Sequence, residues 1–293
     1  MRRLFVCLVM LCAAGASWAV PPYMLGTKLP PADLAALMTD VEKKLQAEGF
    51  NVVGRHTPKG LAEHGTVVVT DAAMLEALRS IGGSAVVAAG IRVGVKSDGT
   101  VSYMNPDYWY RAYLRGQFDR AHPAVLAVQT RLEHALGAGA GFGGDVAAAD
   151  LPGYRYMVGM EKFDSPRSEL QTHASFQEAL KTVRANLASG VGGTARVYEV
   201  VVPDREMAVF GVAMNDSGNG EGWWVNKIGA DQIAALPYEV FVVGNKVYAL
   251  YGRYRIALGW PSLGMGQFMG ILNAPSAIQA TLGRVAGVPA AAN

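Results

Sequence analysis

The segment RGQFDRAHPAVLAVQTRLEHALG, residues 115–137, recurs in altered form as MGQFMGILNAPSAIQATLGRVAG, residues 265–287. The two copies align without a gap and share eight identical positions, among them the Gly-Gln-Phe triplets at 116–118 and 266–268. Self-similarity at a long and fixed spacing is typical of an internally repeated architecture. We therefore expect a tandem duplication, and the rest of the chain can be compared half against half.

Upstream of each copy, the chain shows the same order of secondary-structure signals. Each half is predicted to open on a short strand, to continue with an amphipathic helix and two strands, and to close with a tight-turned hairpin. A short helical segment precedes each hairpin. In order, these signals lie at 23–26, 31–50, 50–55, 65–71 and 91–106 in the first half, and at 156–159, 174–189, 194–202, 206–214 and 238–253 in the second.

This order predicts the fold class α+β, with two tandem repeats of the form β-α-β-β-(α)-β-β-α. Each repeat would be a mainly antiparallel sheet with helices packed on one face. The predicted boundaries are a first repeat domain at 20–136, a Gly-rich linker at 137–153, a second repeat domain at 154–287 and a disordered tail at 288–293.

The first nineteen residues have the three parts of a secretory signal peptide. Arg2 and Arg3 are followed by an apolar run and then by Ser17-Trp18-Ala19, a small-x-small cleavage pattern. We expect residues 1–19 to be removed by cleavage near Ala19. The protein would then be exported, and periplasmic or extracellular.

Cleavage would change what the chain can bind. Cys7 and Cys12 leave with the signal peptide, so the mature chain is cysteine-free and forms neither disulfides nor thiolate metal sites. Loss of Arg2 and Arg3 from 26 basic residues balances the 24 acidic ones. A neutral chain without basic clusters is not expected to bind nucleic acid.

The helix ending in LQAEGFNVVGR and the hairpin ending in GTVSYMNPDYW resemble the bacterial family known as domain of unknown function 302. The first half is similar to one copy of this domain, and the second half to a more divergent copy. The resemblance implies an α+β fold and a tendency to dimerise. It implies no catalytic residues, because the family has no established activity.

We find no motif for catalysis, for a cofactor or for a metal. The five histidines have none of the HxH, HxxxH or HExxH spacings that hold metals. No nucleophile-elbow or phosphate-loop pattern precedes a helix. A catalytic group assembled only by the fold would be invisible to spacing. We therefore predict no catalytic residues, no cofactor and no metal site, and lean against an enzyme.

Aromatic residues beside arginines supply the candidate ligand-binding residues. Such clusters line ligand clefts or interfaces, and alternatively they pack in the core around the last helix. Trp223 and Trp224 follow a polar loop and would form either a lid over a cleft or core anchors. The candidates are Tyr103, Tyr108, Trp109, Arg111, Trp223, Trp224, Tyr251 and Arg253.

Residues 256–283 carry no Asp, Glu, Lys or Arg. A membrane-spanning helix is not predicted there, because Pro261 and Pro275 interrupt the segment and it is rich in glycine. We expect a contact face that packs on the other repeat, on a second subunit, on a partner or on lipid headgroups. The interface candidates are Met265, Gly266, Phe268, Met269 and Gly270.

The sequence favours a non-catalytic exported binding or interaction module, with its repeats docked through this apolar face as a pseudo-dimer. A homodimer, a small ligand or a protein would be its partner. Two alternatives stay open. One is an enzyme or redox accessory with a carboxylate, His and Tyr brought together by the fold; the other is a protein attached peripherally to a membrane.

Overall fold

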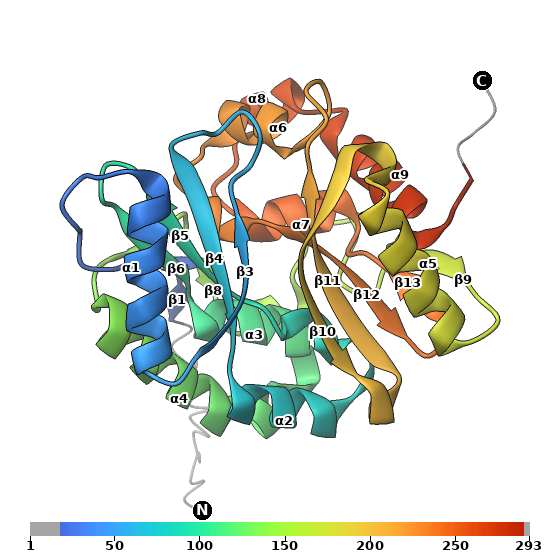
Figure 1. Ribbon diagram of the computed structural model, residues 1–293, viewed down its shortest axis with the longest axis horizontal. Coiled ribbons are helices and arrows are strands. Elements are labelled where there is room, and N and C mark those ends of the chain that lie inside the picture. The colour runs from blue at the N-terminus through green and yellow to red at the C-terminus, as the bar shows by residue number, and fades with distance from the viewer. Residues whose placement is uncertain (1–17, 290–293) are drawn as a thin grey trace, which may run out of the picture.

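The computed structural model describes residues 18–289 and has an α+β fold, as the sequence predicts. Two large antiparallel sheets, one in each half of the chain, lie side by side with helices around them (Figure 1). Among the described residues, no helix is both long and apolar enough to cross a membrane.

The first sheet has six strands in the order β3-β4-β5-β6-β2-β7. Helix α1 buries an apolar stripe against it, and Asp33 caps the helix by accepting a hydrogen bond from the amide of Ala35 at 2.9 Å. The strands are β2 (Tyr23–Leu25), β3 (Asn51–His56), β4 (His64–Thr70), β5 (Ile91–Lys96), β6 (Val101–Met104) and β7 (Gly141–Phe142). The helices are α1 (Leu34–Ala47), α2 (Ala72–Ile81), α3 (Pro106–Leu114) and α4 (Phe118–Leu136).

The second sheet has five strands in the order β10-β11-β12-β13-β9. Helix α5 buries Phe176, Leu180, Val183 and Leu187, as their helical spacing predicts. The strands are β9 (Glu169–Thr172), β10 (Thr194–Val202), β11 (Met207–Met214), β12 (Tyr238–Val243) and β13 (Lys246–Tyr248). The helices are α5 (Phe176–Ala188), α6 (Glu221–Ile228), α7 (Gly252–Gly259), α8 (Met265–Gly270) and α9 (Ala274–Ala286).

Position for position, the second sheet has the order of the first five strands of the first sheet. The strand predicted at 156–159 is an exception, because these residues form turns and β9 takes that place in the sheet. Tyr156 instead donates a hydrogen bond to the carbonyl of Leu263 at 2.7 Å and stacks on Phe268. The segment therefore packs beside α8. The duplication itself stays a prediction.

The glycine-rich segment 137–153 is more ordered than the linker we predicted. Its residues form β7 on the outer edge of β2, and β8 (Val146–Ala147), which pairs with β1 (Ala19–Val20). Gly141 lies so close to Pro21 that a Cβ atom would come within 2.3 Å of the ring. Residues 1–17 of the predicted signal peptide and residues 290–293 of the predicted tail lie outside the described residues.

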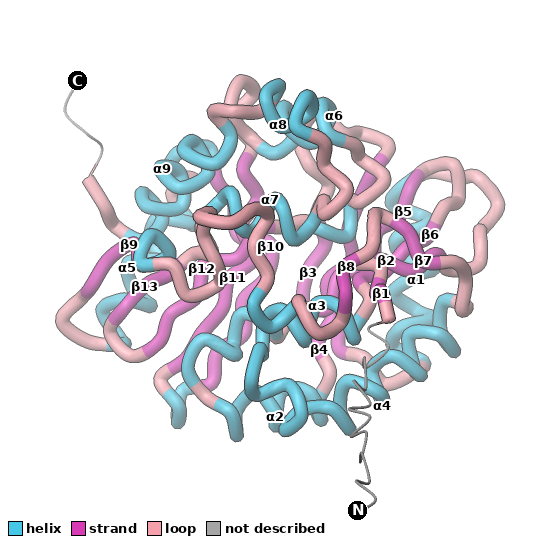
Figure 2. Tube along the Cα trace, turned by 180° about the vertical axis from the view of Figure 1, so that it is seen from behind, coloured by secondary structure: helices cyan, strands magenta, loops and turns pink. Residues whose placement is uncertain are grey.

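The two halves pack through equivalent elements. The 3-10 turn η1 (Gly83–Ala88) of the first half contacts β11 and β12, and η7 (Ile233–Ala235) of the second half contacts β4, β5 and β6. Edge strands β3 and β10 also run beside each other (Figure 1). Seen from behind, α3 and α7 lie centrally, where the halves meet (Figure 2). Each sheet is thus covered on its inner face by a turn of the other half.

Candidate functional site

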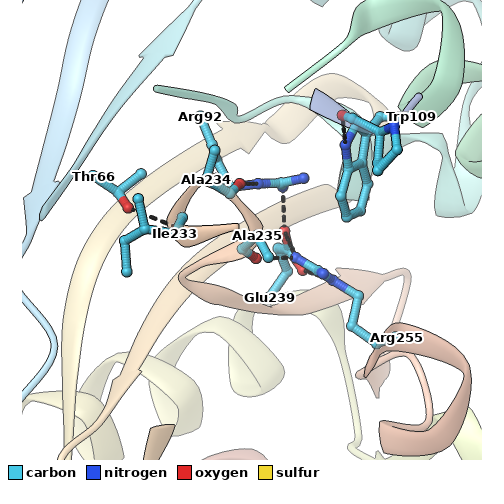
Figure 3. A network of polar contacts seen from close by, with 9 residues as sticks. Thr66, Arg92, Trp109, Ile233, Ala234, Ala235, Glu239 and Arg255 are labelled. Carbon is cyan, nitrogen blue, oxygen red and sulfur yellow. Dashed lines mark hydrogen bonds and ion pairs between the residues drawn. The ribbon is translucent and has the colours of Figure 1, made fainter. Parts of the chain in front are cut away.

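Three buried charged side chains lie where the halves meet (Figure 3). Arg92 of β5 donates from Nη1 to Glu239 of β12 at 2.5 Å, and Arg255 of α7 donates from Nε to the same carboxylate at 3.0 Å. Carbonyls of η7 accept further hydrogen bonds, Ala234 from Arg92 at 2.9 Å and Ala235 from Arg255 at 2.6 Å. Buried charges are tolerated only when paired in this way.

Trp109 packs against both guanidiniums of this junction. The Cζ atoms of Arg92 and Arg255 are 4.5 and 4.9 Å from its ring centroid, close enough for cation–π attraction. Its indole Nε1 donates to the carbonyl of Pro22 at 2.8 Å. Because two guanidiniums share one carboxylate, the electron-rich ring helps to balance the excess positive charge.

Most of the aromatic candidates serve the core. Tyr108 donates its hydroxyl to the carbonyl of Leu258, and Tyr23 donates to that of Gly259, each at 2.9 Å. These carbonyls end α7 and have no partner within the helix. Tyr103 is also buried, which raises its pKa to about 12, and Trp224 packs edge-on against Trp260. The four candidates Tyr103, Tyr108, Trp109 and Trp224 are therefore closed to solvent.

The remaining candidates lie nearer the surface. Tyr251 accepts a hydrogen bond from Nη1 of Arg167 at 2.7 Å, and the guanidiniums of Arg167 and Arg253 lie 5.0 and 5.6 Å from its ring centroid. Both arginines also approach Glu161, at 3.5 and 3.3 Å. Arg111 pairs with Asp107 on the same helix, and Trp223 lies under the ammonium of Lys227. Of these candidates, Tyr251 borders a sizeable cavity.

That cavity, which we call the α9 groove, has a volume of about 840 Å³. Helix α9 forms one wall, and β9 with the residues before it forms the other. Arg167 and Arg284 place two guanidiniums on it, while Leu170, Ala280 and Val288 supply apolar surface. Glu169 is at its rim, where Lys246 contacts the carboxylate at 2.9 Å and lowers its pKa. A second hollow of about 540 Å³ lies beside the groove and shares Ser276, Ala280 and Arg284 with it.

Small side chains on α9 explain why the helix borders two hollows. Ser276, Ala280 and Gly283 lie three and four residues apart and so share one helix face. The aligned positions of the first half hold Leu126, Thr130 and Glu133, which are larger. The absence of charge from residues 256–283 therefore goes together with smaller side chains on this face of α9, which leave room for the two hollows.

Two polar side chains of the groove lack some of the partners that they could bind. Gln279 donates from Nε2 to the carbonyl of Arg167 at 2.6 Å, but its Oε1 has no hydrogen-bond partner among the described residues. Arg284 donates from Nη2 to the hydroxyl of Thr281 at 3.3 Å, and it makes no ion pair with a described carboxylate. The groove therefore holds a cation without a counter-charge and an acceptor without a donor.

His56 and Glu221 form the closest His–carboxylate contact between the halves. Nε2 of His56 and Oε1 of Glu221 are 2.6 Å apart, and the side chains are 3% and 0% exposed. Glu221 also accepts a hydrogen bond from the amide of Met214 at 3.3 Å. The pair cannot reach a substrate in solvent, so its place in this structure is at the packing between β3 and α6.

The interface candidates on α8 do not join the two halves, although the uncharged stretch meets the first half at Leu258 and Gly259. Met265 and Met269 are 52% and 59% exposed, Gly266 and Gly270 are also exposed, and Phe268 is half-buried against Tyr156. Helix α8 contacts α6 of its own half. Of the uncharged stretch, residues 256–260, which end α7 and include Trp260, are buried in the core, whereas α8 and one face of α9 are open.

Sequence reasoning missed Arg167, Gln279 and Arg284, the groove residues with the most distinctive chemistry. In the part of the chain that the structure describes, no three His, Cys, Asp or Glu side chains are placed to hold a metal ion. Comparison with family models, with curated proteins and with solved structures finds no match to this chain.

Proposed function

We propose that this protein is an exported, non-catalytic binding module that takes a ligand with an anionic group and an apolar part into the α9 groove. The observation that carries this proposal is that two arginines, Arg167 and Arg284, line the groove together with small and apolar side chains. Guanidiniums form strong, charge-assisted hydrogen bonds to carboxylates, phosphates and sulfonates. The apolar side chains of the groove would bury the remainder of the ligand.

The pseudo-dimer is part of the same proposal. It is supported by the matching strand order, by the reciprocal packing of η1 and η7, and by the resemblance to domain of unknown function 302. A rigid junction between the halves would leave the groove as a preformed site. Export rests on the N-terminal signal pattern alone.

Two other functions have less support. An enzyme would need accessible acid–base groups, and the His56–Glu221 pair is closed to solvent. Peripheral membrane attachment is favoured by the exposed side chains of Met265, Met269 and Leu272 near Trp223 and Lys227. Flotation of the mature chain with anionic liposomes tests it, and a protein that stays at the bottom of the gradient would exclude it.

The groove is tested with 8-anilinonaphthalene-1-sulfonate, an anionic and largely apolar dye. We expect its fluorescence to rise with the mature chain and to be lost in Ala280→Trp, which fills the groove from an exposed position. Arg284→Gln should lower the affinity for this dye by about tenfold, the equivalent of one charge-assisted hydrogen bond. The affinity for the uncharged dye N-phenyl-1-naphthylamine should not change.

Met269→Ser is the matched control, since this residue is exposed on α8 away from the groove. Dye binding that falls in Met269→Ser but persists in Ala280→Trp would place the dye on α8 and refute the proposed site. Far-UV circular dichroism and melting temperature show whether each variant keeps the native fold.

A further inference from the structure

One wall of the α9 groove is the edge of a sheet. Strand β9 pairs with β13 on one side, and no described strand pairs with its other side. A strand edge presents unpaired backbone N–H and C=O groups, which make it a template for a further strand. The opposite edge of this sheet, β10, lies against β3 of the other half.

The first half shows how this place in the sheet is filled. Its strand β2 corresponds to β9, and β7 pairs antiparallel with the free side of β2, with Tyr23 opposite Phe142. The pairing extends to hydrogen bonds from the amide of Leu25 to the carbonyl of Ala140 and from the amide of Gly139 to the carbonyl of Leu25, both at 2.9 Å. Within residues 18–289, β9 has no counterpart of β7.

We propose that the α9 groove receives an extended peptide segment bearing a carboxylate, which pairs antiparallel with β9 as β7 pairs with β2. This inference rests on the proposed function and specifies its ligand. The four residues of β9 span about 13 Å at 3.3 Å per residue, so three or four residues of the peptide would pair with it. Backbone hydrogen bonds would supply affinity, and the side chains of α9 would supply specificity.

The charges of the groove select the partner. Arg284 has no described counter-ion and would pair with an acidic side chain or a terminal carboxylate. Arg167, which contacts Tyr251 and Glu161 just before β9, adds a second cation to the groove. A second copy of this chain, paired through the same edge, would bring like guanidiniums together and is disfavoured.

The test uses a library of random decapeptides displayed on phage and selected against the full mature chain, with Ala280→Trp for counter-selection. We expect enriched peptides to carry an acidic residue within an extended, partly apolar sequence. The tightest one is then synthesised with a single N-methyl group at each residue in turn. N-methylation should weaken binding more than tenfold at alternate residues, whose N–H groups face β9, and little at the residues between them.

Arg284→Gln should lower the affinity for the peptide by about tenfold. The peptide should also displace 8-anilinonaphthalene-1-sulfonate from the wild-type chain. If no acidic peptides are enriched while the dye still binds in the groove, strand addition is refuted and the proposed function survives. Strand addition is equally refuted if N-methylation has no alternating effect, or if the chain instead dimerises through β9. If Ala280→Trp does not reduce binding of the dye, the dye does not occupy the groove and the proposed function itself is refuted.

Discussion

Arg92 and Glu239 occupy the same position in the two halves, and they pair with each other at 2.5 Å. Each is the second residue of the third strand in its sheet, β5 and β12. In a symmetric dimer of identical chains, a residue near the axis would meet its own copy, and like charges would repel. Opposite charges at this position allow the junction to be buried. They also favour contact between one half and the other over contact between two copies of the same half.

Replacement of Glu239 by Gln is expected to destabilise the protein by about 3–5 kcal/mol, because it leaves two buried guanidiniums without a carboxylate. Urea denaturation monitored by tryptophan fluorescence gives the free energy of unfolding. Joint replacement of Arg92, Glu239 and Arg255 by Met, Leu and Met should cost less, because no buried charge is left unpaired.

Glu63→Gln is the control for this charge, since Glu63 is exposed in the loop before β4. It should change the free energy of unfolding by less than about 0.5 kcal/mol. A loss in Glu239→Gln as small as in this control would mean that the carboxylate does not hold the junction together.

The contact between β3 and β10 depends on Gly54. A Cβ atom at Gly54 would lie 2.4 Å from the carbonyl oxygen of Val197, so Gly54→Ala must push the two edge strands apart. We expect a loss of about 1–3 kcal/mol, typical of overpacking. Gly116→Ala, where a Cβ meets nothing within 4 Å, is the matched control. Equal stability of the two variants would contradict close packing of the halves.

Tyr108 and Tyr110 allow the effect of a hydrogen bond on stability to be distinguished from the effect of burying a hydroxyl group. Tyr108→Phe leaves the carbonyl of Leu258 without its partner and should cost about 1–3 kcal/mol. Tyr110→Phe removes a buried hydroxyl that has no hydrogen-bond partner among the described residues, so it should be neutral or stabilising. Thermal unfolding of both variants measures the difference, and a larger loss for Tyr110→Phe would reverse our assignment.

Sequence pattern predicted the elements well where periodicity was strong. Strands β4 and β11 and helices α1 and α5 lie at the predicted places, since each has an apolar face that must be buried. The predicted strand at 156–159 failed because its Tyr-Met-Val-Gly matches the first strand in letters, whereas Val158 is 88% exposed. Burial, and not residue identity, decided between 156–159 and β9.

The groove was harder to predict. Absence of charge from 256–283 marked the right segment, but a covered face and an open groove both favour small uncharged residues. What distinguishes them is the identity of the opposite wall, and Arg167 is more than a hundred residues away from α9 in the sequence. The pairing of Arg92 with Glu239 was similarly hidden, although Glu239 is the one charged residue of its apolar strand β12.

High pH should unfold the protein steeply. Burial raises the pKa of Tyr103 to about 12, and it also raises the pKa of Tyr23, Tyr110 and Tyr238. An unfolded chain would ionise these side chains near their ordinary value of 10.0. Because the unfolded state then releases protons that the folded state retains, stability is fully present below pH 10 and falls as pH rises toward 12.

Absorbance at 295 nm reports tyrosinate, and far-UV circular dichroism reports the fold. We expect the buried tyrosines to ionise together with unfolding, in one cooperative step above pH 10, while exposed tyrosines titrate earlier. Tyr103→Phe removes one of these groups and should move the midpoint to higher pH. Smooth ionisation of all tyrosines near pH 10, with the fold intact, would show that the hydroxyls at the junction are open to solvent.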